Sequence, residues 1–274
     1  MVATPIGNLD DVGLRALSVL SGAALIAAED TRTTAVLLDR HKIRARLVSL
    51  HEHNERRAAE GILDALREGN DVALVSDAGT PAISDPGSAL VARAREEGFR
   101  VTPIPGPNAA VAAMSVAGMP ETGFLFYGFL PAKAEARRHA IEALRPLPWP
   151  LVFYEEPHRI LECVEDLAAT LGGERDVVIA RELTKMFEQI HRCRLDEARA
   201  WLSADANRVK GEFVLVVAGA KKSGSPDAAE TDRVLGIVLD ELPLAQAVKI
   251  TCAITGAKRN LVYARALELA AQEK

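Results

Sequence analysis

The sequence predicts an α/β protein made of two sheet-and-helix domains and a small helical module. Three observations lead to this fold class. Short apolar runs alternate with segments of helical period from Ala24 to Ala117, and a second such series follows Pro120. A polar stretch then precedes 44 residues of helical pattern, and the 49% hydrophobic content supplies enough apolar surface for several cores. We expect domains at 1–120 and 121–220, a linker at 221–230 and a helical module at 231–274.

The first domain is expected to contain a parallel sheet covered by helices, because strand-like and helix-like segments alternate in it. The expected strands are 24–28, 47–50, 71–76 and 100–104, and the expected helices are 54–68, 86–97 and 108–116. Only three residues, Met1 to Ala3, precede the turn-forming run at 4–8. A first strand of the usual length of about five or six residues would need sequence upstream of Met1.

The second domain repeats this alternation. Its expected strands are 124–129, 151–155, 177–181 and 213–217, and its expected helices are 134–145, 158–171 and 195–204. In the C-terminal module, apolar stripes at 234–239, 244–254 and 260–269 are broken at Pro243 and Gly256. This pattern predicts three helices, the last of which carries basic residues near its start.

Composition excludes several classes of protein. The longest apolar runs, such as 22–28, fall short of the roughly 18 to 20 residues of a membrane helix, and no basic segment followed by an apolar stretch marks a secretory signal. The three cysteines are odd in number, far apart and without metal-ligand spacing. The net charge of −5 argues against a uniformly cationic surface but allows local basic patches. We expect a reduced, cytoplasmic protein with no membrane contact and no metal.

Three loops rich in Gly, Pro and Asp follow apolar strands, at 4–9, 77–87 and 103–108. Loops beyond the carboxyl ends of parallel strands border the ligand crevice, so the three can converge on one ligand. Each loop could also be an ordinary turn. The second, with eleven residues, exceeds the usual two to six of such a connection. Neither G-x-G-x-x-G nor G-x-x-x-x-G-K-[ST] occurs, which argues against NAD-dependent dehydrogenases, kinases and GTPases.

A set of motifs in order along nearly the whole chain resembles the family of ribosomal RNA small subunit methyltransferase I, in the tetrapyrrole methylase superfamily. The motifs are Thr-Pro-Ile-Gly-Asn-Leu at 4–9, Ala-Glu-Asp-Thr-Arg at 28–32, Ser-Asp-Ala-Gly-Thr-Pro at 76–81, Pro-Gly-Pro at 105–107, Phe-Tyr-Glu at 153–155, Arg-Glu-Leu-Thr-Lys at 181–185 and Lys-Gly-Glu at 210–212. The resemblance implies a two-domain tetrapyrrole-methylase-like fold. It also implies a homodimer that uses S-adenosylmethionine to methylate a cytidine 2′-hydroxyl of 16S ribosomal RNA at the decoding centre.

The resemblance also implies that the cofactor lies in the cleft between the two larger domains. The residues expected to contact it, mapped motif by motif, are Pro5, Ile6, Gly7, Asn8, Leu9, Asp77, Ala78, Gly79, Ile83, Asn108, Ala109, Phe153, Tyr154, Glu155, Gly211, Glu212 and Phe213. As an ionised carboxylate, Asp77 could accept hydrogen bonds from the cofactor's ammonium group or ribose hydroxyls. It could equally cap a turn.

Transfer of a methyl group to a hydroxyl needs alignment of the two reactants and an acceptor for the hydroxyl proton. Four carboxylates end strands near the expected cleft: Glu29, Asp30, Glu155 and Glu182. We rank Asp30 and Glu155 first as proton acceptors, with Glu29 and the neighbouring Arg32 as further catalytic candidates. Each carboxylate could instead belong to a structural ion pair.

RNA contacts are expected from basic side chains on the surface. The candidates are Arg40, Lys42, Arg44 and Arg46, in a local basic run, together with Arg181, Lys185, Lys258 and Arg259. Such runs are also common on plain solvated surfaces. Two rival functions stay open, a tetrapyrrole-precursor C-methyltransferase and a noncatalytic RNA-binding assembly factor. The helical module favours the RNA methyltransferase, because a small porphyrinoid substrate gives no obvious use for it.

Overall fold

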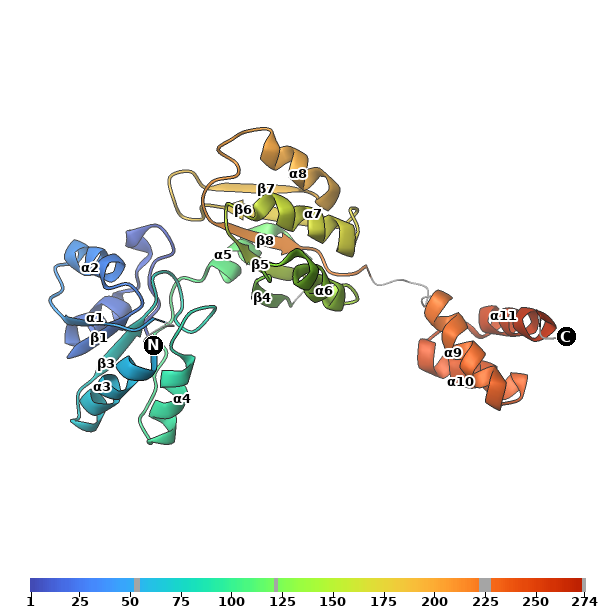
Figure 1. The fold of residues 1–274 in the computed structure, drawn as a ribbon, viewed down its shortest axis with the longest axis horizontal. Coiled ribbons are helices and arrows are strands. Elements are labelled where there is room, and N and C mark those ends of the chain that lie inside the picture. The colour runs from blue at the N-terminus through green and yellow to red at the C-terminus, as the bar shows by residue number, and fades with distance from the viewer. Residues whose placement is uncertain (52–54, 121–122, 222–227, 273–274) are drawn as a thin grey trace. The chain divides into compact units, whose positions relative to one another are not determined.

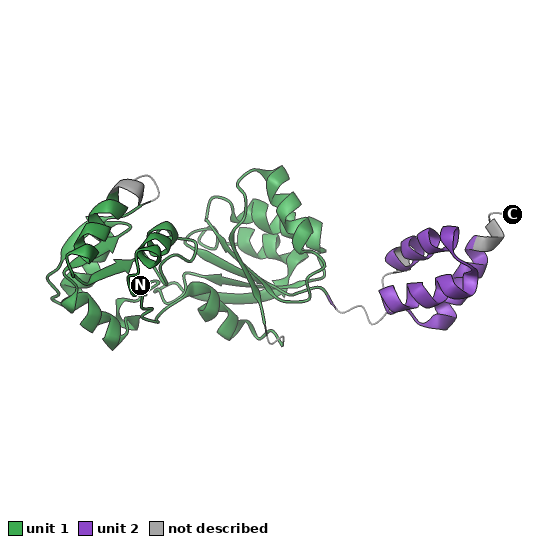
Figure 2. Ribbon diagram, turned by 90° about the horizontal axis from the view of Figure 1, so that it is seen from below, with its two compact units in different colours: residues 1–220 green, residues 221–274 purple. Residues whose placement is uncertain are grey.

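The computed structural model describes residues 1–51, 55–120, 123–221 and 228–272. The chain divides into two compact units, Met1–Ala220 and Lys221–Lys274 (Figure 2). The expected α/β fold class is confirmed, with a parallel sheet, a second mixed sheet and a helical end (Figure 1). The expected helix at 54–68 was predicted to start at Asn54, which lies outside the described residues.

The first sheet of unit 1 has three parallel strands in the order β2-β1-β3. Its strands are β1 (Leu25–Ala28), β2 (Arg46–Ser49) and β3 (Val72–Val75), and the helices of this lobe are α1 (Leu14–Gly22), α2 (Thr31–Arg40), α3 (Glu55–Arg67) and α4 (Ser88–Glu96), after a short 3-10 turn at Leu9–Asp11. The central strand β1 is buried along its whole length. Because the strands are parallel, their carboxyl ends share one edge of the sheet.

The expected strand at 100–104 does not form, and this prediction was wrong. Only Ile104 pairs there, in an isolated parallel bridge with Val2, and its N–H donates to the Met1 carbonyl oxygen at 2.8 Å. Pro103 and Pro105 flank it without N–H donors, so the segment cannot continue a ladder. On the other side, Val2 N–H donates to the carbonyl oxygen of Leu74 at 2.8 Å, which places Met1 to Ala3 beside β3.

The second sheet has five strands in the order β4-β5-β8-β6-β7, of which only β4 and β5 are parallel neighbours. The strands are β4 (Leu125–Phe129), β5 (Leu151–Glu155), β6 (Asp176–Arg181), β7 (Gln189–Arg194) and β8 (Phe213–Val217). One face packs against α6 (Ala134–Leu144), α7 (Ile160–Leu171) and α8 (Leu195–Ser203), and the other packs against α5 (Ala109–Ala117). Alternate residues of β5 therefore serve two cores, with Phe153 in the first and Val152 in the second.

Unit 2 contains three helices, α9 (Ala228–Glu241), α10 (Leu244–Thr255) and α11 (Arg259–Gln272), as the apolar stripes predict. Pro243 precedes α10, and Gly256 ends it in the left-handed conformation that favours glycine. Its core consists of Leu235, Ala247, Val248, Val262 and Ala266.

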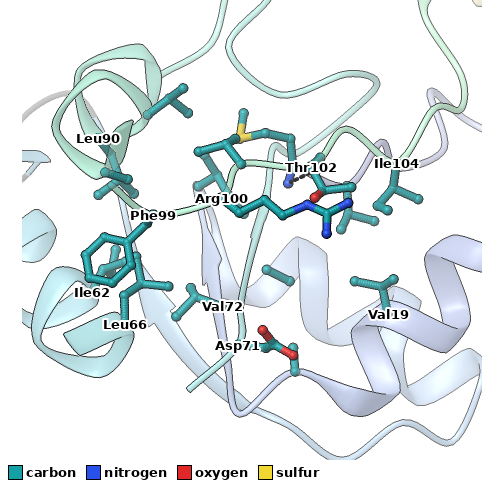
Figure 3. A pocket seen from close by; sticks show the side chains of 18 of the residues that line it. Val19, Ile62, Leu66, Asp71, Val72, Leu90, Phe99, Arg100, Thr102 and Ile104 are labelled. Atoms are coloured by element: carbon teal, nitrogen blue, oxygen red, sulfur yellow. Dashed lines mark hydrogen bonds between the residues drawn. The ribbon is translucent and has the colours of Figure 1, made fainter. Parts of the chain in front are cut away.

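A cavity of about 350 Å³ lies next to Met1 at the amino end of β3 (Figure 3). Apolar side chains of three helices surround it, among them Val19, Ile62 and Leu90. In the part of the chain that the structure describes, no helix is both long and apolar enough to span a membrane. Within the same residues, no group of three or more His, Cys, Asp or Glu side chains could hold a metal ion.

Candidate active site

The two sheets of unit 1 border one cleft of about 310 Å³, at the opposite strand ends from the cavity beside Met1. Glu29 and Asp77 line it directly after β1 and β3, while Tyr154 and Glu155 line it at the end of β5. This position, outside the carboxyl ends of strands, is the usual ligand site of open α/β sheets. The volume falls in the range of small-molecule sites.

The loop that follows β3 forms one wall of the cleft and is fixed by bonds to two other loops. Thr4 and Gly79 exchange backbone hydrogen bonds of 2.8 and 3.1 Å, and the Thr80 hydroxyl donates to the Pro107 carbonyl oxygen at 3.1 Å. Gly79 has a φ of +81°, and a Cβ there would lie 3.4 Å from the Ile6 side chain. The three loops predicted to converge do so at this point.

Unit 1 has two lobes, one built on each sheet, and the start of α5 connects them at the cleft. Asn108 caps the helix, since its side-chain oxygen accepts from Val111 N–H at 3.1 Å. Tyr154, from the second sheet, accepts a hydrogen bond from Ala110 N–H at 3.2 Å through its phenolic oxygen. Both interactions position the helix N-terminus beside the cleft, where its dipole favours negatively charged groups.

The acidic residues after β1 and β3 are linked to one another. Asp77 Oδ1 accepts from Asp30 N–H at 2.8 Å, and Glu29 Oε2 lies 3.4 Å from the Asp77 nitrogen. Desolvation raises the pKa of Glu29 and of Asp77. Asp30 does not line the cleft. It caps α2 and pairs with Arg32 at 2.6 Å, and the hydrogen bond from Arg32 lowers the Asp30 pKa to about 2.

Glu155 is buried at the end of β5. Its Oε1 accepts from Glu156 N–H at 2.9 Å and lies 3.2 Å from Arg159 Nε, whereas its Oε2 has no hydrogen-bond partner among the described residues. Burial, followed by the nearby Glu155 carboxylate, raises the pKa of the Cys163 thiol. The orphaned oxygen is the buried polar atom in the cleft wall that a ligand donor could satisfy.

The structure brings most of the predicted cofactor residues to the cleft: Ile6, Asp77, Ala78, Gly79, Ile83, Asn108, Ala109, Tyr154, Glu155, Glu212 and Phe213. Pro5 and Phe153 are buried outside the lining, and the strand alternation of β5 turns Phe153 into the core. Gly7, Asn8 and Leu9 line a separate hollow beside Arg40 and Lys185. Gly211 packs against the Glu182 side chain.

Several cleft residues were not predicted from the sequence: Thr80, Ser84, Asp85, Phe129, Glu156, Pro157, Ala180, Leu183 and Val214. Ser84 and Asp85 belong to the eleven-residue loop whose length already indicated a binding role. Burial and then Glu29 raise the pKa of Asp85 to about 6, while a hydrogen bond with Ser76 opposes the shift.

The predicted RNA-contact residues differ in their exposure and in their partners. Lys42, Arg44 and Arg46 are exposed, but Arg46 starts β2 and so lies at the amino edge of the sheet, away from the cleft. Arg40 pairs with Asp10 at 3.1 Å. Lys258 and Arg259 are exposed at the start of α11.

Two of the basic candidates are engaged within the protein. Arg181 is only 6% exposed, and its guanidinium donates to the carbonyl oxygens of Lys210 and Phe187. The expected phosphate contact of Arg181 is therefore corrected, because its donors serve the β6–β7 connection and the backbone shortly before β8. Lys185 Nζ lies 2.9 Å from both Glu182 and Glu212, which largely neutralise its charge.

Comparison with known proteins agrees with this fold. Residues 1–199 match the Tetrapyrrole (Corrin/Porphyrin) Methylases, and residues 225–270 match the RsmI C-terminal HTH domain. Diphthine synthase superimposes with a TM-score of 0.63 at 17% identity over 79% of this chain and 88% of that one. Uroporphyrin-III-C-methyltransferase from Thermus thermophilus superimposes with a TM-score of 0.57 at 22% identity over 79% and 92%. At these identities the two structures show a shared fold alone.

The two-lobed fold with its cleft defines the class of this protein as a tetrapyrrole methylase. Ribosomal RNA small subunit methyltransferase I of Escherichia coli O157:H7 is 51% identical over 268 residues, 98% of this chain and 94% of that protein. The Pseudomonas aeruginosa protein of the same name is 49% identical over 270 residues, 98% and 96%. The chain belongs to the family of ribosomal RNA small subunit methyltransferase I, which confirms the resemblance found in the sequence.

Proposed function

We propose that this protein transfers a methyl group from S-adenosylmethionine to the 2′-hydroxyl of a cytidine in 16S ribosomal RNA, at the decoding centre of the small subunit. Family membership supports the reaction class. The observation that carries the choice of donor is the charge of the cleft. Six carboxylates line it, Glu29, Asp77, Asp85, Glu155, Glu156 and Glu212, and none of its described lining residues is lysine, arginine or histidine.

An acidic cleft suits a cationic methyl donor. S-adenosylmethionine carries a sulfonium and an ammonium group, and carboxylates attract both through charge and charge-assisted hydrogen bonds. Asp77 lines the cleft, and its carboxylate can accept such bonds. The apolar Ile6, Ile83 and Leu183 provide contact for the uncharged parts, and Gly79 allows close approach of the backbone. The residues present therefore fit this group.

The chain's own residues have three tasks in the proposed reaction. When bound, S-adenosylmethionine supplies an electrophilic methyl carbon. The bonds among the loops at Thr4, Gly79 and Pro107 hold the cleft wall rigid, so the reactants stay aligned without reorganisation. Leu183 and Phe129 contribute apolar surface to the cleft. A carboxylate of the cleft accepts the hydroxyl proton; the assignment of Asp30, Glu155, Glu29 and Arg32 to catalysis stays a prediction.

We also propose that 231–274 recognises RNA while 1–120 and 121–220 hold the cofactor. An acidic cleft repels phosphates, so most of the phosphate contacts to the RNA must come from other surfaces while the target ribose reaches the cleft. Lys258 and Arg259 are exposed at the start of α11, where helix N–H groups favour phosphate. A homodimer is the proposed assembly, and light scattering in solution tests it.

The two rival functions make different demands. A tetrapyrrole precursor is a bulky polyanion, and an acidic cleft without a basic residue in its described lining opposes it. A noncatalytic factor would have no need for a donor-binding cleft. Methyl transfer from labelled S-adenosylmethionine should be measured to small ribosomal subunits, large subunits and a tetrapyrrole precursor. We expect label in small subunits alone. Label in the precursor, or in none of the three, would reject the proposal.

A further inference from the structure

We infer that Asp85 is the catalytic residue that accepts the proton of the ribose 2′-hydroxyl, an inference that rests on the proposed function. Asp85 is half-buried and lines the cleft together with Glu29, Asp77 and Tyr154. It was not among the residues that the sequence singled out. Three observations lead to it: the conformation of its loop, the partners of the other carboxylates and its electrostatic surroundings.

The backbone just before Asp85 is held in conformations that are unfavourable for residues with a side chain, and a glycine follows it with a positive φ. Ala82 and Ser84 have φ angles of +67° and +65°, and Gly87 has a φ of +116°. Residues with a side chain rarely adopt this region, and such strain gathers at functional sites. The second lobe packs directly on this loop, because a Cβ on Gly128 of β4 would lie 2.8 Å from Ser84 Oγ. Contacts from both lobes therefore fix the position of Asp85.

Three of the other acidic side chains in the cleft already have a basic side chain beside them. Glu155 lies beside Arg159, Glu212 pairs with Lys185 at 2.9 Å, and Glu156 lies 3.4 Å from His158 Nε2. Each of these contacts occupies one oxygen of the carboxylate within the protein. Within the described residues, no lysine or arginine forms an ion pair with Asp85.

Glu29 and Asp77 have no ion pair in the described residues either, but one oxygen of each carboxylate faces a backbone N–H of these loops. Asp77 Oδ1 accepts from Asp30 N–H, and Glu29 Oε2 lies 3.4 Å from the Asp77 nitrogen. The neighbour of Asp85 is the neutral Ser76 hydroxyl, which also lies 3.3 Å from the Ala78 carbonyl oxygen and can turn toward it. Asp85 is therefore the carboxylate that can accept a proton at least structural cost.

The proposed step balances as follows. The 2′-oxygen forms a bond to the methyl carbon of the donor while the carbon–sulfur bond breaks and its electron pair stays on sulfur. The hydroxyl proton moves to the Asp85 carboxylate and leaves to water after the product departs. The groups that face Asp85 are Glu29, Asp77 and Ser76, with Tyr154 nearby. Because burial and Glu29 raise the Asp85 pKa to about 6, this group is ionised at neutral pH yet basic enough to share a proton.

The test is single-turnover methylation of small ribosomal subunits by the full chain across a range of pH. In the wild type, the rate should rise with pH through about 6, because Asp85 must be deprotonated to act. Asp85→Asn should lower the rate by about two to four orders of magnitude and remove this rise. Its affinity for S-adenosylmethionine should fall by less than about tenfold, because five of the six cleft carboxylates remain. Asp85→Glu should recover part of the rate, and Asp39→Asn, an exposed aspartate of α2, is the control.

The possible outcomes distinguish a failure of the proposed function from a failure of the role assigned to Asp85. A wild type that places no methyl group on ribose would reject the proposed function and this inference with it. An active wild type with an Asp85→Asn variant of near-normal rate would reject the inference alone. The inference is equally wrong if Asp85→Asn keeps the pH rise or loses S-adenosylmethionine binding while its melting temperature is unchanged.

Discussion

Gly79 shows how one residue without a side chain shapes the cleft. Its φ of +81° strains any residue with a side chain, and a Cβ there would already touch the Ile6 side chain at 3.4 Å, so the γ carbons of a branched residue would crowd the cleft wall. Gly79→Val should therefore weaken S-adenosylmethionine binding at least tenfold, about 1.4 kcal/mol, measured by calorimetry. Gly98→Val is a matched control, since Gly98 has a φ of +83° and nothing within 4 Å of its virtual Cβ. Equal loss of affinity in both variants would contradict the role of Gly79.

Asp30 tests the sequence-based catalytic assignment. That assignment predicts that Asp30→Asn retains the cofactor but loses methylation by about two to four orders of magnitude. The structure instead shows Asp30 as the cap of α2, outside the cleft lining, and asparagine caps helices as well as aspartate. We expect a rate within about threefold of the wild type in single-turnover assays. A hundredfold loss would return the proton acceptor to Asp30.

For single residues, the sequence predicted which loops form the cleft but not which of their side chains line it. The motif at 76–81 pointed to Asp77 and Gly79, and both line the cleft. Asp85 was missed because its role depends on burial and on the charge of Glu29, which approaches from another strand. Phe153 was misplaced because a motif carries no information on which face of β5 a side chain occupies.

Among the elements, the contact between the end of β5 and the start of α7 depends on a buried ion pair. The side chain of Glu155 is fully buried and that of Arg159 is 15% exposed. Glu155→Gln should lower the free energy of unfolding by about 3–5 kcal/mol, because it leaves a buried guanidinium without its countercharge. Glu142→Gln, which removes an exposed pair with Arg145, should cost less than about 1 kcal/mol. Urea unfolding that gives equal losses would contradict this assignment.

The cavity beside Met1 leads to a prediction that an added N-terminal strand would stabilise the protein. Apolar side chains surround it, and Val2 already bonds to β3 on its rim. An added N-terminal segment of four alternating apolar residues should extend this pairing and raise the free energy of unfolding by about 1–3 kcal/mol, because burial of apolar side chains exceeds the cost of ordering them. A Gly-Ser segment of equal length is the control. Equal unfolding curves would show that the cavity does not accept a strand.

Element prediction succeeded where apolar periodicity was strong and failed where other forces decided. Strand β7 was not predicted because Gln-Ile-His-Arg-Cys-Arg is polar, yet this edge strand pairs with β6 along its whole length. The apolar stretch at 100–104 suggested a strand, but Pro103 and Pro105 prevent a ladder. Helices α1 and α2 were also left out of the expected elements, although both have buried faces.

In the whole molecule, the separation into two compact units predicts separable binding functions. Deletion of 231–274 should leave the affinity for S-adenosylmethionine unchanged while methylation of small subunits falls, because the cleft belongs entirely to unit 1. Filter binding and single-turnover assays measure the two quantities. A truncated chain that methylates subunits at the full rate would show that the helical module does not recognise RNA.

If Lys258 and Arg259 of unit 2 contact RNA phosphates, binding of the small subunit should depend on salt through them. Lys258→Ala with Arg259→Ala should weaken subunit binding and lower the slope of log affinity against log salt by about 1 to 2, as two phosphate contacts are lost. Arg233→Ala is the control, since Arg233 already pairs with Glu230 at 2.8 Å. An unchanged slope in the double variant would place the RNA contact elsewhere.

The position of the transferred methyl group tests the central claim most directly. Unmethylated small subunits should be incubated with the full chain and S-adenosylmethionine carrying an isotopically labelled methyl group, and the RNA digested to nucleosides for mass spectrometry. Label on the ribose of cytidine, from one site at the decoding centre, is the predicted result. Label on a base, on another nucleoside or on no RNA at all would contradict the account.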